Sequence, residues 1–147
     1  MKPDPLYEAD RWFRQAKDDL AFARLAHANG YSAQCCFICQ QVCEKALKAV
    51  FYANGERLVL GHSVLRLLTD LDRDELHELV DGAKMLDQFY VPTRYPNGLP
   101  DGVPSEVYTE AQAAQAIVYS EQLMSAVEAI LDEYRDPDRP AEESGDA

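Results

Sequence analysis

Apolar residues recur at helical spacing from residue 32 to residue 54, and polar residues fill only the narrow stripe that remains. Two adjacent apolar rows cover more than half of this helical surface, which is wider than a surface helix needs. The rows contain Cys35, Cys36, Cys39, Val42, Cys43, Ala46, Leu47, Ala49 and Val50. We therefore predict a central helix over residues 32–54, with other helices packed against most of its sides.

The remaining stripe of this helix is polar and is expected to face solvent. It consists of Gln41, Glu44, Lys45 and Lys48. Glu44 and Lys48 have the spacing and order of a favourable i,i+4 ion pair. Ser32 is placed to cap the start of the helix, and Asn54-Gly55 can end it in a left-handed turn.

The same periodicity predicts further helices on both sides of the central one. The first covers residues 4–28, with Pro5 in its first turn, and a short one covers residues 63–71. The next is capped by Asp72 or Asp74 and runs to about Val91. The last begins at Thr109, with Gln112 as its capping-box partner. Between Pro92 and Thr109 the density of Pro and Gly predicts no regular structure. A loop of this length in a compact domain is typically functional or mobile.

No strand pattern of useful length is present, so we predict an all-α fold, a single antiparallel helical bundle of about five helices. A chain of 147 residues is long enough for one domain with its own core. We place this domain at residues 1–135. Residues 136–147 are Pro-rich and carry five acids against Arg139, which predicts a disordered acidic tail.

Charge and cysteine usage narrow the range of functions. A net charge of −12 argues against nucleic-acid binding by bulk electrostatics, so a phosphate site must be a local cluster of basic residues.

All four cysteines lie within one helix, where we expect reduced thiols that pack as small apolar residues. We expect no metal and no cofactor. No apolar run reaches the length of a membrane span and the first residues are acidic, so a cytoplasmic location is the default expectation.

Four features of the chain, taken in order, resemble a known family. They are AKDDLAFARLA in the first helix, Tyr31 leading into QQVCEKALKA, His62 at the start of a short Leu-rich helix, and TRYPNG after the fourth helix. This order is similar to that of HEPN domains (higher eukaryotes and prokaryotes nucleotide-binding) over residues 11–131. The resemblance implies a helical bundle, frequent homodimerisation and frequent pairing with a separately encoded minimal nucleotidyltransferase. It also implies that the protein is either a metal-independent ribonuclease or a non-catalytic nucleotide- or RNA-binding protein.

The ribonuclease members carry an Arg followed after four to six residues by a His, and this chain matches that spacing once, at Arg57 and His62. A neutral His can accept the proton of a ribose 2′-hydroxyl, while Arg neutralises the charge that develops on the phosphate. The spacing also arises by chance, and here it spans a Gly-containing loop. The alternative is a His62 that starts a helix and an Arg57 that is a solvated loop charge.

TRYPNG offers a second candidate site. Arg94 lies beside Tyr95 in a segment made rigid by two prolines, which presents a guanidinium and an aromatic face together and suits a phosphate with a stacked base. The alternative is an Arg94 that ties the loop to helix ends through carbonyls or carboxylates. Lys45 and Lys48 can add positive charge to a ligand groove, or can be solvated side chains partnered by Glu44.

Three functions follow as hypotheses. The first is a dimeric nucleotide- or RNA-binding module that acts with a minimal nucleotidyltransferase and uses Arg94, Tyr95, Lys45 and Lys48. The second is a metal-independent endoribonuclease of the kind found in toxin–antitoxin pairs, with Arg57 and His62 as catalytic residues. The third is a structural, oligomerising scaffold without a ligand.

Overall fold

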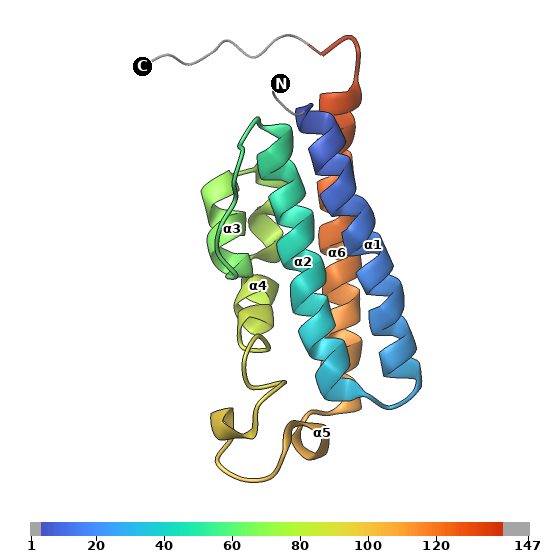
Figure 1. The fold of residues 1–147 in the computed structure, drawn as a ribbon, viewed down its shortest axis with the longest axis vertical. Helices are drawn as coiled ribbons and strands as arrows, with labels where there is room; N and C mark the ends of the chain where they lie inside the picture. Colours follow the sequence, from blue (N-terminus) through green and yellow to red (C-terminus); the bar gives the residue numbers. More distant parts are fainter. Residues whose placement is uncertain (1–3, 140–147) are drawn as a thin grey trace.

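The computed structural model describes residues 4–139, and these residues form an all-helical fold (Figure 1). The α-helices are α1 (Pro5–Ala28), α2 (Ser32–Ala53), α3 (Val64–Leu71), α4 (Val80–Asp87), α5 (Pro104–Val107) and α6 (Glu110–Arg135). Two 3₁₀ helices join them, η1 (Asp74–Leu79) and η2 (Pro96–Gly98). The predicted all-α fold class is confirmed.

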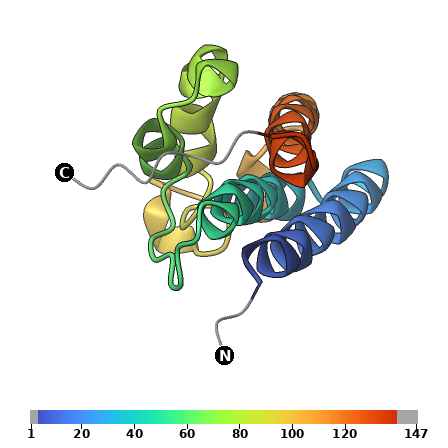
Figure 2. The same cartoon turned by 90° about the horizontal axis from the view of Figure 1, so that it is seen from above.

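Helix α2 lies at the centre, as its wide apolar surface predicts. Helices α1 and α6 pack against one side of it, and α3 and α4 pack against the other (Figure 2). Helices α2 and α6 run in the same direction and α1 runs opposite to both (Figure 1). The four cysteines of α2 are fully buried, together with Val42, Leu47 and Val50, within one continuous core. Burial of this apolar surface is the main stabilising contribution to the bundle.

Several predicted helix ends are confirmed by their hydrogen bonds. Asp4 caps α1 and accepts from Leu6 N at 3.0 Å, and Pro5 occupies the first turn. Thr109 and Gln112 form the predicted reciprocal capping box at the start of α6. Gly55 has a φ of +96°, a left-handed conformation that lets the chain turn back after α2.

The predicted cap at Ser32 is wrong. The N-cap of α2 is Tyr31, and no side chain accepts a hydrogen bond there. The preceding turn holds the backbone instead, because Tyr31 N donates to the Ala26 carbonyl at 2.9 Å and Gly30 has a φ of +82°. The short turn after α1 thus determines where α2 begins.

The predicted fourth helix is divided into two parts, and neither Asp72 nor Asp74 caps it. Asp72 ends α3 in the left-handed conformation with a φ of +47°, and Arg73 precedes η1 without a side-chain cap. The tighter 3₁₀ segment places Leu76 in the core, and α4 then ends at Asp87 instead of near Val91. The segment between Pro92 and Thr109, predicted to be irregular, contains the short helices η2 and α5.

No helix within residues 4–139 is long and apolar enough to cross a membrane. The predicted acidic tail lies mostly outside the described residues, because only positions 136–139 of it are described. These positions form a turn in which Arg139 N donates to the Asp136 carbonyl at 3.2 Å.

Candidate functional site

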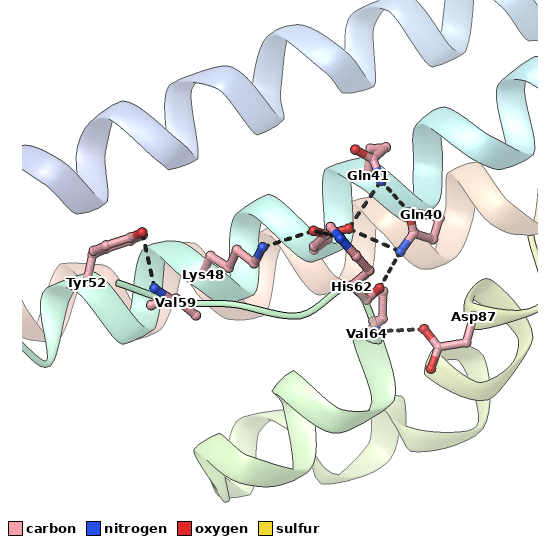
Figure 3. A network of polar contacts seen from close by, with 9 residues as sticks. Gln40, Gln41, Lys48, Tyr52, Val59, His62, Val64 and Asp87 are labelled. Carbon is pink, nitrogen blue, oxygen red and sulfur yellow. Dashed lines mark hydrogen bonds and ion pairs between the residues drawn. The ribbon is translucent and has the colours of Figure 1, made fainter. Parts of the chain in front are cut away.

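The loop between α2 and α3, residues 54–63, returns along the surface of α2 in an extended conformation (Figure 3). Two hydrogen bonds hold it there: Val59 N donates to the Tyr52 hydroxyl at 3.4 Å, and Gln40 Nε2 donates to the His62 carbonyl at 2.7 Å. This α2–α3 loop places His62 over the middle of α2, well before the point where α2 ends.

Under the loop lies a buried polar network centred on Glu44, whose side chain is only 7% exposed. Its Oε1 accepts from Lys48 Nζ at 3.0 Å and contacts His62 Nδ1 at 2.9 Å. Its Oε2 accepts from Gln41 Nε2 at 3.2 Å and Gln40 Nε2 at 3.3 Å. Four nitrogen partners thus surround both carboxylate oxygens, which satisfies an ionised carboxylate.

The expectation that the whole polar stripe of α2 faces solvent is therefore wrong for Glu44 and Lys48. Both are buried, although the ion pair between them forms as predicted. Lys45 also has a partner, because its Nζ contacts Asp19 Oδ2 of α1 at 2.5 Å. The α2–α3 loop and α1 close over this side of the helix, and a charge buried in this way must be paired.

Asp87 at the end of α4 fixes the start of α3, immediately after His62. Its carboxylate accepts from Ser63 Oγ at 2.6 Å, from Val64 N at 2.6 Å and from Leu65 N at 3.3 Å. These bonds satisfy backbone donors that every helix start leaves free. They also tie the end of α4 to the α2–α3 loop, which brings Tyr90 next to His62.

The His62 ring stacks on Tyr90, with ring centroids 5.0 Å apart and an interplanar angle of 19°. The same tyrosine ring also contacts Arg94, whose Cζ lies 4.8 Å from the Tyr90 ring centroid. Phe37 of α2 and Tyr95 complete the cluster, with centroids 4.4 Å and 5.3 Å from Arg94 Cζ. Arg94 Nε donates to the Tyr90 carbonyl at 2.8 Å, which fixes the orientation of the guanidinium. We refer to Phe37, His62, Tyr90, Arg94 and Tyr95 as the aromatic–arginine cluster.

The position of Arg94 has features of both predicted roles, a phosphate-binding residue and a residue that ties the loop to a helix end. It bonds a backbone carbonyl near the end of α4, as a loop-tying residue would. It forms no ion pair with a carboxylate of the described residues, and its side chain is exposed. Arginines elsewhere on the surface do form such pairs: Arg11, Arg14, Arg24, Arg66, Arg73 and Arg135. On a chain with a net charge of −12, a guanidinium without an acidic partner is available to an anionic ligand.

Arg57 and His62 are not brought together. Arg57 lines a pocket of about 360 Å³ with Tyr52 and Gly55 at the far end of α2, whereas His62 bonds Glu44. Glu44 and Ala53, the last residue of α2, are separated by about 14 Å along the helix axis. Arg57 makes no ion pair, hydrogen bond or ring contact with the rest of residues 4–139. The arginine that shares a contact partner with His62 is Arg94.

The cysteines of α2 form part of the core. Burial raises the pKa of the Cys36 thiol to about 12, and it also raises the pKa of Cys43. A hydrogen bond to Cys35, together with burial, raises the pKa of Cys39. These thiols are held in the protonated form, in which they pack as small apolar side chains. No group of three metal-ligating side chains occurs in the described part of the chain.

Sequence reasoning missed Glu44 and Tyr90 as parts of the site. Tyr90 lies close to the expected end of the predicted fourth helix, and nothing near it in the sequence indicates that it contacts His62 and Arg94. The sequence does contain a signal for the burial of Glu44. Apolar rows flank this residue on both sides, and the polar stripe that remains on α2 is narrower than the solvent-facing side of an ordinary surface helix. A stripe this narrow indicates that part of it is covered.

Comparisons with known proteins agree on the fold. A family model described as "HEPN domain" matches residues 9–130. A protein of Thermus thermophilus with a crystal structure has 38% sequence identity and a TM-score of 0.77, covering 82% of this chain and 96% of that one. An archaeal HEPN homologue has 33% sequence identity and a TM-score of 0.71, and the match covers 84% of this chain and 97% of that one. An HEPN domain protein of Thermotoga maritima has 32% sequence identity and a TM-score of 0.66, and the match covers 83% of this chain and 98% of that one. Among proteins with curated functions, none matches this sequence.

Proposed function

Because the chain belongs to the HEPN domain family, we propose that it is a binding module for a phosphate-bearing ligand, a nucleotide or RNA, held at the aromatic–arginine cluster. The observation that carries this proposal is Arg94, an exposed guanidinium with a fixed orientation and no carboxylate partner among the described residues. Planar guanidinium groups bind phosphate oxygens in pairs, and charge-assisted bonds of this kind are among the stronger polar contacts.

The aromatic neighbours supply the second requirement of a nucleotide site. Tyr95 is 51% exposed and follows Arg94 directly, so a base can stack on its ring while the phosphate meets the guanidinium. His62 lies on the other side of the cluster, stacked on Tyr90. Lys45 and Lys48 are left out of the proposed contacts, because their ammonium groups already pair with Asp19 and Glu44.

Chemical-shift mapping tests the location of the site. Amide and aromatic resonances are followed while ATP or a short single-stranded RNA is added to the protein. The proposal expects the largest shifts at Phe37, Tyr90 and Tyr95. Shifts confined to Tyr52 and Gly55 would move the site to the pocket at Arg57. Absence of binding by both ligands would favour the structural scaffold.

We also propose that the protein is a homodimer that works with a minimal nucleotidyltransferase. The support is membership of the family, in which both associations are frequent. Sedimentation equilibrium at high micromolar concentration should give twice the mass of the 147-residue chain, and a monomer would contradict the dimer. Co-expression with a small nucleotidyltransferase encoded beside it should yield a complex that survives purification, and separate elution would contradict the pairing.

A metal-independent ribonuclease is the second candidate, and one observation favours it. A carboxylate on Nδ1 orients His62 and leaves Nε2 without a partner among residues 4–139, on a side chain that is 61% exposed, as in sites where a His transfers protons. In this arrangement Arg94 replaces Arg57 as the arginine that accompanies His62. Incubation with mixed RNA in EDTA should then release fragments, and His62→Ala should abolish the release. If the protein is a binder only, neither form cleaves.

A further inference from the structure

Glu44 is buried beneath the α2–α3 loop, and every polar partner it has is a nitrogen. Lys48 and the two glutamine amides can only donate at these nitrogens. Glu44 therefore meets them as a carboxylate without a proton, and its Oε1 acts as an acceptor toward His62 Nδ1 as well. It follows that Nδ1 carries the hydrogen of this 2.9 Å bond.

We propose that Glu44 is a positioning residue that fixes His62 as the Nδ1–H tautomer. A neutral imidazole has one hydrogen, so Nε2 then carries a bare lone pair. Nε2 has no hydrogen-bond partner among residues 4–139, and the His62 side chain is 61% exposed. The ligand therefore meets a hydrogen-bond acceptor at Nε2, on a ring that shares Tyr90 as a contact partner with the cationic guanidinium of Arg94.

Two other contacts of His62 leave the ring little freedom to turn away from Glu44. Gln40 Nε2 holds the His62 carbonyl at 2.7 Å, and Tyr90 stacks on the ring. Lys48 shares the same Glu44 oxygen at 3.0 Å and provides the counter-charge that a buried carboxylate needs. Since Lys48 supplies that charge, His62 can stay neutral without leaving Glu44 unpaired.

This inference deepens the proposed function and rests on it for the identity of the ligand. His62 and Arg94 both contact Tyr90, so a ligand whose phosphate binds Arg94 and that extends across Tyr90 can offer a hydroxyl hydrogen to the bare Nε2. In nucleic acids that hydroxyl is the ribose 2′-OH, which DNA lacks. Glu44 thus gives the cluster a preference for ribose over deoxyribose, although it touches neither sugar nor phosphate.

The tautomer can be measured without any ligand. Long-range ¹H–¹⁵N spectra are recorded at a pH above the imidazole titration, and the His62 signals are assigned by their loss in His62→Gln. We expect a protonated, pyrrole-type shift for Nδ1 and an unprotonated, pyridine-type shift for Nε2. The opposite assignment, or a rapidly averaged mixture, would overturn the inference. Because the ligand is absent, failure of the proposed function leaves this result unaffected.

Variants then test whether Glu44 is the cause. Glu44→Gln leaves Lys48 buried without a counter-charge and can unfold, so the double variant Glu44→Gln/Lys48→Met removes both charges at similar volume. In the folded double variant the His62 tautomers should become mixed, and the preference for an RNA over a DNA oligonucleotide of the same sequence should fall to about one. Gln41→Ala, which removes a donor to the other carboxylate oxygen, is the control and should keep the Nδ1–H form. Retention of that form and of the RNA preference in the double variant would contradict a role for Glu44.

Discussion

Arg94 and Tyr90 contact each other in two ways: Arg94 Nε donates to the Tyr90 carbonyl at 2.8 Å, and Arg94 Cζ lies 4.8 Å from the Tyr90 ring centroid. The first contact uses only one of the three guanidinium nitrogens. The second holds the guanidinium near an aromatic ring that also stacks on His62. Tyr90 is therefore the residue that both candidate ligand-binding side chains contact.

Replacement of Tyr90 tests this relationship. Tyr90→Leu keeps an apolar side chain but removes the ring that Arg94 and His62 share, so nucleotide or RNA affinity should fall roughly three- to tenfold. Tyr90→Phe is the control, because it keeps the ring and no hydrogen bond of the Tyr90 hydroxyl occurs within residues 4–139. Fluorescence anisotropy with a labelled oligoribonucleotide measures both. Equal affinities in the two variants would show that the ring does not organise the site.

Gly82 of α4 allows a close approach by α6. A Cβ at this position would overlap ring carbons of Tyr119, whose hydroxyl donates to the Leu79 carbonyl at 2.7 Å. Helix propensity alone favours Gly82→Ala by about 1 kcal/mol, whereas overpacking costs about 1–3 kcal/mol. We expect a net loss in the free energy of urea unfolding. Asp81→Ala, an exposed change one residue away, should stay within about 0.5 kcal/mol of wild type. Stabilisation by Gly82→Ala would contradict the close contact between α4 and α6.

The buried thiols predict how reactivity and stability depend on pH. Cys36, Cys39 and Cys43 have raised pKa values, about 12 for Cys36, so they should not react with Ellman's reagent at pH 8 until the protein is unfolded in guanidinium. Unfolded thiols titrate near pH 8.5, at roughly their ordinary pKa.

The raised pKa values of these thiols also determine in which direction the free energy of unfolding changes with pH. Above about pH 8.5 the unfolded chain loses thiol protons that the folded chain keeps, so the free energy of unfolding should be highest below this pH and should fall as the pH rises. Urea unfolding at pH 7.5 and pH 9.5 measures the difference. Rapid labelling of the native protein, or equal stability at the two pH values, would contradict the buried placement of these cysteines.

The fold follows largely from local patterns in the sequence. The apolar rows of α2 predict its central position because a helix surface this wide has to be covered by other helices. The cap at Asp4 and the capping box at Thr109 are predictable because each depends on residues only a few positions apart.

The site was harder to predict because its contacts join distant parts of the chain. Burial of Glu44 depends on the α2–α3 loop returning along α2, and no residue next to Glu44 indicates that path. Tyr95 is predictable as an aromatic neighbour of Arg94 because it is adjacent in sequence. Phe37 is separated from Arg94 by three helices, so only the packed structure shows that they meet. Arg57 and His62 match the expected spacing in sequence, but the loop between them is extended, so Arg57 lines the pocket at the end of α2 whereas His62 bonds Glu44.

The central claim, that Arg94 binds the phosphate of the ligand, is tested most directly by comparing Arg94→Ala with Arg66→Ala in equilibrium titrations with a labelled single-stranded RNA. Both variants remove one positive charge, but Arg66 is exposed and paired with Asp70 on α3. A charge-assisted contact contributes about 1.5–3 kcal/mol, so Arg94→Ala should weaken binding roughly ten- to a hundredfold while Arg66→Ala changes it less than about twofold. Wild-type affinity in Arg94→Ala, with reduced thermal stability alone, would show that Arg94 only ties the loop to the end of α4.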